Sequence, residues 1–227
     1  QKRVLSTNAL IIDTEHEFLS GVNKIVWQTL SSSTEEFGVP GNEYVAGTHM
    51  NPNVTWWKQG RDFISYLDRC MYMLQQGLFV ADVLYYYGDD VPNFVFLKED
   101  FPELNFGYDW DKCSKDVILN RVSFDGEKIV LPDGMSYRVL VLAPEQSIDL
   151  NVLKKVESLV NAGMTVFSSR PEEATGLTGF PESDLELKAV TGRLWGAIDG
   201  KNITENKVGN GRVIWVQHIN EVLAWRK

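Results

Sequence analysis

Residues 43–57 contain the side chains of this sequence that are best suited to catalysis or ligand binding. Glu43 precedes an aromatic residue, and the stretch "GTHMNPNVTWW" follows it closely. Hydrolysis of a glycosidic bond uses two carboxyl groups, and Glu43 can supply one of them as an acid or a base. His49 and Asn51 can bind sugar hydroxyls, and the indole ring of Trp56 offers a flat surface to the apolar side of a pyranose. We therefore predict that this stretch contributes to a carbohydrate site.

A second carboxylate for such a site is harder to assign. Glu35 and Glu36 lie on or near the same loop, whereas Glu15 and Glu17 fit the exposed face of a short helix. The sequence therefore leaves the partner of Glu43 open.

The aromatic and polar residues of this stretch also have a purely structural interpretation. Trp57 belongs to the apolar stripe of the helix that follows, which predicts a core position. Asn51-Pro52 is a common turn dipeptide. For His49 and Trp56, ligand contact and packing both stay open.

Asp89 and Asp90 form a second group of candidate residues, because they follow an apolar segment that is typical of a strand. Ligands of parallel sheets bind at the carboxyl ends of the strands, so a contact to a sugar hydroxyl or to calcium is one interpretation. The alternative, which we favour from the sequence, is a solvated turn.

The elements that must position these residues follow from apolar periodicity and turn residues. In the first third we predict a short helix at 15–22, a buried strand at 23–30, a long loop to residue 55 and a helix at 56–76 that ends before Gly77. Loops of that length are uncommon unless they are functional or disordered, and the aromatic residues argue against disorder.

The remaining two thirds alternate strands with helices. The sequence predicts strands at 78–90, 137–143 and 164–169, helices at 112–120, 147–163 and 181–196, and hairpins at 122–134 and 205–216, with Asp125-Gly126 and Gly209-Asn210-Gly211 as their turns. Ser147 with Asp149, and Ser183, are the expected helix caps. This alternation predicts an α/β fold with an open, mostly parallel, doubly wound sheet over 79–227, and a separate region over 1–78.

The α/β region lacks the sequence signals of common catalytic sites. Its first strand ends in "YYYGDD", where two carboxylates would repel a pyrophosphate and no glycine-rich turn is present. Neither "VLVLAPEQ" nor "VFSSRPEE" forms the turn that exposes a nucleophilic serine. We therefore predict a structural or lid role for this region.

Composition excludes several classes of partner and cofactor. The net charge of −9 and the pI of about 4.9 disfavour nucleic acid. Cys70 and Cys113 fall in helical patterns and are expected to be buried, unpaired thiols, too few for a zinc or disulfide framework. His16, His49 and His218 lack ligand spacing, so we expect no transition metal and no evident cofactor. No run approaches the length of a membrane helix, and the first ten residues do not resemble a signal peptide.

Three quoted segments carry a family resemblance: "PGNEYVAGTHMNPNVTWW", "RCMYMLQQGLFVADVLYYYGDD" and "YRVLVLAPEQSIDLNVLKKVESLVNAGMTVFSSRPEEATGL". The first two resemble the end of the catalytic barrel of bacterial α-L-rhamnosidase-like enzymes of glycoside hydrolase family 106. The third resembles the glutamine-amidotransferase-like domain that follows that barrel. Residues 1–78 would then be the end of a (β/α)8 barrel, and 79–227 the amidotransferase-like domain.

The resemblance implies function as well as fold. Family members are longer, are secreted or periplasmic, act on rhamnose-containing plant polysaccharides, invert configuration and use calcium. The tryptophans and His49 would line a sugar subsite with Gln28, which stands where the family is expected to have a histidine. Asn8 stands where an acidic residue is expected. The resemblance therefore implies a fragment that is inactive in isolation.

Two other functions compete with this one. The chain could be a non-catalytic module that supports a barrel, forms homo-oligomers or binds a glycan. A true amidotransferase would need a nucleophilic cysteine at a strand-to-helix turn with a histidine partner. Cys113 and His218 do not fit that pattern, and we disfavour this alternative.

Overall fold

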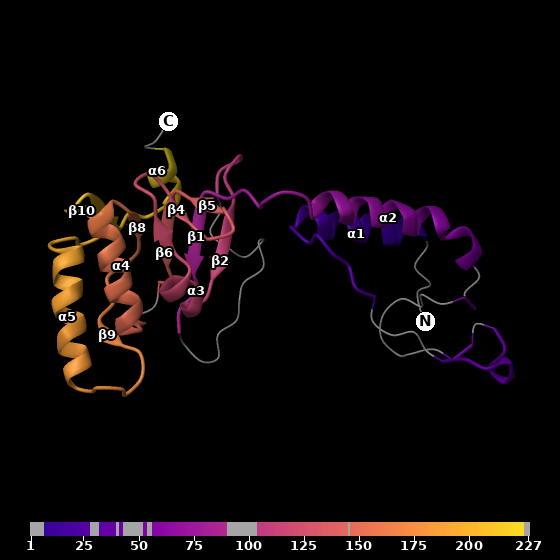
Figure 1. The fold of residues 1–227 in the computed structure, drawn as a ribbon, viewed down its shortest axis with the longest axis horizontal. Coiled ribbons are helices and arrows are strands. Elements are labelled where there is room, and N and C mark those ends of the chain that lie inside the picture. The colour runs from indigo at the N-terminus through magenta and orange to yellow at the C-terminus, as the bar shows by residue number, and fades with distance from the viewer. Residues whose placement is uncertain are drawn as a thin grey trace. The chain divides into compact units, whose positions relative to one another are not determined.

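The computed structural model describes residues 7–27, 32–39, 41–42, 52–53, 56–89, 104–144 and 146–224 (Figure 1). The chain divides after Gly77 into two compact units, and the second begins at Leu78. The first is called the helical unit below, and the second the α/β unit.

The helical unit is built on two helices, α1 (Thr7–Leu19) and α2 (Arg61–Leu74), with short 3-10 turns η1 (Glu35–Phe37) and η2 (Trp57–Gln59). Phe63 and Leu67 lie one turn apart on α2 and are buried. They pack with Phe18 of α1 and with other half-buried apolar side chains. The helix predicted at 56–76 is therefore confirmed as η2 followed by α2.

Two predictions for the helical unit were wrong. Residues 23–27 form no strand, and Val26 is 79% exposed. A strand requires a neighbour for its backbone hydrogen bonds, and the described residues of this unit contain none. Helix α1 begins at Thr7, earlier than the short helix predicted at 15–22, so Asn8 lies on a helix rather than on a strand.

The α/β unit contains a six-stranded sheet in the order β10-β11-β8-β6-β1-β2 (Figure 1). Its strands are β1 (Val83–Tyr86), β2 (Trp110–Cys113), β6 (Val139–Leu142), β8 (Thr165–Phe167), β10 (Glu205–Val208) and β11 (Gly211–Ile214). Every pairing is parallel except that of β10 with β11. This confirms the mixed α/β fold with a mostly parallel sheet.

Helices and two small sheets complete the unit. The helices are α3 (Lys115–Asn120), α4 (Leu150–Ala162), α5 (Glu182–Trp195) and α6 (Ile219–Ala224). The small sheets pair β3 (Ser123–Phe124), β4 (Ile129–Val130) and β5 (Ser136–Tyr137), and β7 (Ser147–Ile148) with β9 (Glu173–Ala174).

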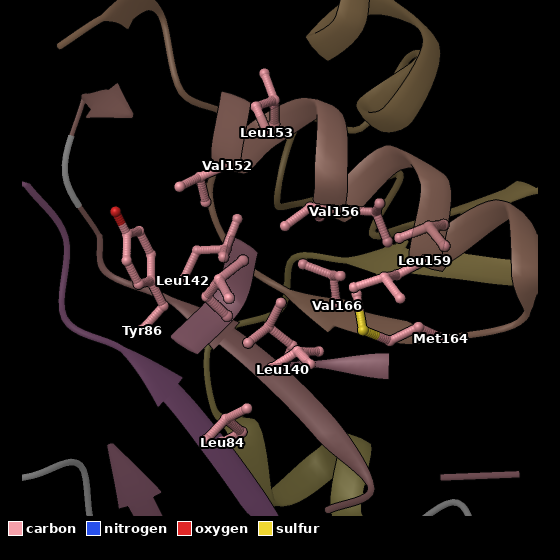
Figure 2. Packing of buried hydrophobic residues seen from close by; sticks show 14 of the residues in the cluster. Leu84, Tyr86, Leu140, Leu142, Val152, Leu153, Val156, Leu159, Met164 and Val166 are labelled. Atoms are coloured by element: carbon pink, nitrogen blue, oxygen red, sulfur yellow. The ribbon is translucent and has the colours of Figure 1, made fainter. Parts of the chain in front are cut away.

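Both faces of the large sheet are buried, which explains the near-continuous apolar strands. Leu84, Leu140 and Val166 point to one face, where they pack with α4 and α5 (Figure 2). Val83 and Val139 point to the other face, where they pack with α6. Alternate residues of each strand thus enter two separate cores.

The order of the parallel strands creates a topological switch point. The chain passes from β1 to its neighbour β2, and then crosses to β6 on the other side of β1. The strands that follow β1 and β6 in the sequence therefore lie on opposite sides of this pair. In open α/β sheets ligands bind in the crevice at the carboxyl ends of such strands.

Local signals for the helices were mostly correct. Asp149 caps α4 by accepting hydrogen bonds from the N–H groups of Asn151 at 2.8 Å and Val152 at 3.2 Å, and Gly163 follows the helix with φ of 136°. The prediction that Ser183 caps α5 was wrong. That helix already begins at Glu182, so Ser183 lies inside its first turn, and its buried hydroxyl has no hydrogen-bond partner.

The region around Cys113 also differs from the prediction. Cys113 ends strand β2 instead of lying in a helix, and α3 begins two residues later. It is buried and unpaired, as expected. The hairpin of β3 and β4 is confirmed, but its connection is four residues long, because the Asp125 carboxylate binds the N–H groups of Glu127 and Lys128. The hairpin of β10 and β11 is confirmed.

Candidate functional site

Most of the predicted sugar-site residues fall outside the part of the chain that the structure describes. These are Gln28, Glu43, His49 and Asn51, and Asp90 of the second candidate group joins them. Their assignments stay predictions. Trp56 is described, together with short segments that flank the others.

Trp56 lies just before η2, and its side chain is half-buried against the core of the helical unit. A Cβ placed on Gly60 would lie 2.9 Å from Cζ3 of Trp56, so the indole ring covers this glycine closely. Trp57 is 37% exposed, with its ring centroid 6.4 Å from that of Trp56. The core position predicted for Trp57 was wrong, because the 3-10 turn precedes α2 and shifts the apolar stripe.

The loop that carries the candidate residues is tied together at its described ends. The N–H group of Asn42 donates to Oγ of Ser33 at 2.6 Å. Gly41 has φ of 87°, and a Cβ there would lie 2.6 Å from Oγ of Ser33 and 2.7 Å from Nδ2 of Asn53. Only glycine fits both this backbone conformation and this close approach. The segments around Ser33, Gly41 and Asn53 therefore meet in space.

An open apolar groove of about 610 Å³ lies between the two helices of the helical unit. Phe18 and Leu19 of α1 and Met73 and Leu74 of α2 form its apolar walls, and Glu15, Tyr66, Arg69 and Cys70 complete its lining. The O–H of Tyr66 donates to Oε1 of Glu15 at 2.9 Å. This hydrogen bond favours the protonated phenol and raises the pKa of Tyr66 to about 12. Glu15 is exposed, as the sequence predicted for a surface charge, and it accepts this hydrogen bond from Tyr66.

A polar network occupies the switch point of the α/β unit. Tyr86 ends β1 and is 1% exposed, and its O–H donates to the carboxylate of Asp89. The same Asp89 oxygen accepts the N–H of Asp149 at 3.2 Å. The Asp149 carboxylate forms an ion pair with Lys115 as well as capping α4. Burial, and then the Asp89 hydrogen bond, raise the pKa of Tyr86.

This network changes the interpretation of Asp89. The carboxylate is half-buried and its Oδ2 is bound by two protein groups, so it is not the solvated turn that the sequence favoured. The cavity beside it, lined by Tyr86, Gly88 and Ser147 among others, measures about 10 Å³, which is room for one water. Among the described residues, Tyr86 and Asp89 thus occupy part of the crevice themselves. The sequence analysis did not consider that Tyr86 and Asp89 are three residues apart, and this spacing allows their side chains to bind each other.

The resemblance implies a calcium ion, which proteins bind through clusters of oxygen ligands. No three His, Cys, Asp or Glu side chains among them come together as a metal site. The neighbouring carboxylates Asp89 and Asp149 bind Tyr86 and Lys115, respectively.

The Asp149 network makes the stability of the α/β unit dependent on pH. Burial alone would raise the pKa of Asp149, but hydrogen bonds from Lys115 and two amides outweigh it, and the pKa is lowered. The stabilisation is therefore present above the unfolded-state pKa of about 3.9 and is lost as the pH falls through the folded-state value.

Asp149→Asn tests this dependence. Asparagine caps a helix as well as aspartate does but cannot form the ion pair. We expect the variant to be about 1 kcal/mol less stable at pH 7, with a gap that narrows by pH 3. Thermal unfolding of both proteins at the two pH values measures this, and Asp116→Asn on α3 is the control. A gap of equal size at both pH values would contradict the assignment.

Cys113 does not have the properties of an amidotransferase nucleophile. It is 3% exposed, and burial raises the pKa of its thiol, so little thiolate forms at neutral pH. The observation supports the sequence-based rejection of this alternative.

The fold and the candidate sites define an α/β protein in which a helical unit precedes a mostly parallel sheet. The alpha-L-rhamnosidase model of glycoside hydrolase family 106 matches residues 5–227. The chain therefore belongs to this family.

Two relatives are much longer than this chain. A protein of Formosa agariphila named "Putative beta-glucuronidase" is 38% identical over 150 residues, which cover 66% of this chain and 13% of that protein. The solved structure of a rhamnosidase from Novosphingobium sp. PP1Y is similar with a TM-score of 0.80 and 29% identity, over 97% of this chain and 21% of that chain. The chain thus spans a minor part of each relative.

Within the described residues, no helix is both long and apolar enough to cross a membrane.

Proposed function

We propose that this chain is part of a glycoside hydrolase that cleaves α-L-rhamnosides. The observation that carries the proposal is the family match over residues 5–227. The likeness to a solved rhamnosidase over 97% of the chain supports it. The substrate class would be a rhamnose-containing glycan.

The proposal assigns different roles to the two units. Residues 1–78 would close a (β/α)8 barrel, with α1 and α2 among its outer helices. The open groove between these helices, and the exposed apolar side chains of Ile12 and Leu19, fit a surface that other barrel elements cover. Residues 79–227 would be the glutamine-amidotransferase-like domain, which the doubly wound strand order supports.

Glu43 would act as the acid or base of an inverting hydrolysis. In such a reaction one carboxyl group protonates the leaving oxygen while a second activates a water on the opposite face of the sugar. Gln28, His49, Asn51 and Trp56 would bind the sugar. The second carboxylate, and any calcium, would come from outside the described residues.

The proposal also covers the activity of the chain by itself and the location and substrate of the complete enzyme. The chain by itself would be inactive, since one carboxylate and part of a sugar site cannot complete the reaction. The complete enzyme would be periplasmic or secreted and would act on plant polysaccharide.

A graft tests the proposal. The matching fifth of the Novosphingobium rhamnosidase is replaced by this chain, and hydrolysis of an aryl α-L-rhamnoside is measured beside an aryl β-glucuronide. We expect hydrolysis of the rhamnoside. The parent rhamnosidase is the positive control, and circular dichroism establishes that the graft has folded.

A non-catalytic role is the second candidate, and one observation favours it. Within the described residues, Tyr86 and Asp89 bind each other at the switch point of the α/β unit, which suits a supporting domain better than a reactive one. A folded graft that binds rhamnose oligosaccharides in calorimetry without hydrolysing the rhamnoside would favour this function. Binding that Glu43→Gln leaves intact would agree with it.

A further inference from the structure

The outward face of helix α5 is the starting point for an inference about association. This helix lies at the margin of the α/β unit (Figure 1). Leu187, Val190 and Leu194 enter the core on its inner side. Leu185 lies on the opposite side of the helix and is 66% exposed. A single exposed leucine is common on protein surfaces, so its surroundings decide whether this face can bind a partner.

Two more apolar side chains extend the exposed apolar surface beyond the start of α5. Leu177 is 83% exposed, and Phe180 is 58% exposed. The N–H of Phe180 donates to the carbonyl oxygen of Leu177 at 3.2 Å, and the N–H of Leu185 donates to that of Pro181 at 3.3 Å. The three apolar side chains therefore come from adjacent turns of the chain.

The residues that follow Leu185 on the same face are small. Ala189 and Gly192 are four and seven positions later, which places them on the same side of the helix, and both are exposed. A Cβ placed on Gly192 would approach Nη2 of Arg170 at 3.9 Å, the end of a flexible side chain, and no other atom within 4 Å. Another helix can therefore come close to this part of α5.

A face with a large side chain in its first half and small residues in its second half is complementary to itself. In a contact with two-fold symmetry, each residue of one copy meets its counterpart's partner in the other copy. If two α5 helices pack antiparallel, with the axis between positions 187 and 188, Leu185 of each copy would lie between Ala189 and Gly192 of the other.

The charges along one flank of α5 fit the same register. Glu182 and Arg193 are both exposed and lie about three turns apart, so they share a flank of the helix. In the antiparallel register, Glu182 of each copy would lie opposite Arg193 of the other. The Arg193 guanidinium is held at this flank by Glu157, with 2.6 Å between Nε and Oε1. Opposite charges therefore meet at both ends of the contact, although the net charge of −9 opposes random self-association.

We propose that α5 is a dimerisation surface on which a second copy of this chain docks antiparallel, about a two-fold axis between positions 187 and 188. Shape and charge, which are independent properties of the helix, select the same register. A contact centred on one helix pair is small, so we expect a dissociation constant on the order of 10–100 μM. The proposal does not depend on the glycosidase function.

Sedimentation velocity of the whole chain over a concentration series tests the proposal. Leu185→Asn keeps the size of the side chain but makes it polar, and we expect it to weaken self-association about tenfold or more. Because Leu185 lies outside the core, the thermal midpoint of the dilute protein should not change. The matched control is Leu19→Asn in the groove of the helical unit, which should associate like the unaltered chain.

Two results of this experiment would overturn the proposal. One is an unaltered chain that stays monomeric up to about 500 μM, well above the expected dissociation constant. The other is association that Leu19→Asn weakens and Leu185→Asn does not, because the groove between α1 and α2 would then be the contact.

Disulfide crosslinking tests the register. Lys188→Cys lies next to the proposed axis and should link to itself under mild oxidation. Two copies of Glu182→Cys would be about 16 Å apart along the helix, too far for a disulfide, and the same holds for Arg193→Cys. A mixture of these two variants should link one to the other, and the unaltered chain is the control for links through Cys70. Self-linking of Glu182→Cys as efficient as that of Lys188→Cys, or no linking of Lys188→Cys, would overturn the proposal.

Discussion

Replacing Glu43 with Gln in the grafted rhamnosidase is expected to lower kcat on an aryl α-L-rhamnoside by about 100-fold or more. Glutamine keeps the size and hydrogen-bonding capacity of the side chain but can neither donate nor accept the proton that the reaction moves. The effect should appear in kcat more than in KM, since sugar binding does not require the charge.

Glu36→Gln is the matched control for this experiment. Glu36 belongs to the described 3-10 turn η1 of the same loop, seven positions earlier, and it has no assigned role. Its turnover should equal that of the unaltered graft. Unchanged turnover in Glu43→Gln would remove Glu43 from the mechanism. A pH profile gives a second readout, because the loss of an acid or base removes one limb of a bell-shaped curve.

Truncation of Leu140 to Ala is expected to destabilise the α/β unit by about 3 kcal/mol. Leu140 is 0% exposed and lies on β6 in the middle of the sheet, in register with Leu84 of β1 and Val166 of β8. It points into the core beneath α4 (Figure 2), where the lost methyl groups leave a cavity that the rigid strands cannot fill.

Amide hydrogen exchange of peptides from β6, β8 and α4 measures this loss. Leu185→Ala is the control, since Leu185 lies on α5 with 66% of its surface exposed, and its truncation should change exchange little. Equal effects of the two substitutions would contradict the assignment of the core.

The elements predicted correctly were those with strong local signals. Helix α4 has an aspartate cap, apolar residues at helical spacing and a terminal glycine, and these three signals agree. The apolar runs of β1 and β6 indicated strands buried on both faces, as Leu84 and Leu140 confirm. In these segments the sequence near each residue contains most of the information.

The elements that were missed depend on distant partners. Strand β2 contains the charged residues Asp111 and Lys112, so its sequence alone does not indicate a strand. The segment is a strand because it pairs with β1. Residues 23–27 have strand-forming side chains but no described strand to pair with. Pairing across the chain, rather than local preference, decides such segments.

In the candidate sites, too, the sequence did not show which distant residues come together. Tyr86, Lys115 and Asp149 are separated by about thirty residues at each step, and only the crossover from β2 to β6 brings them together. The sequence showed Asp89 as a strand-end carboxylate, but it could not show that the chain's own groups bind it. For Glu43 and its neighbours, the structure describes Ser33, Gly41 and Asn53 of the surrounding loop.

The sugar released by the graft is the most direct measure of whether this chain completes a rhamnoside-cleaving enzyme. Proton nuclear magnetic resonance during the first turnovers on an aryl α-L-rhamnoside identifies the product and its anomer. We predict free L-rhamnose that appears first as the β-anomer, as inversion requires. A folded graft that releases no rhamnose, or that cleaves the glucuronide instead, would contradict the account.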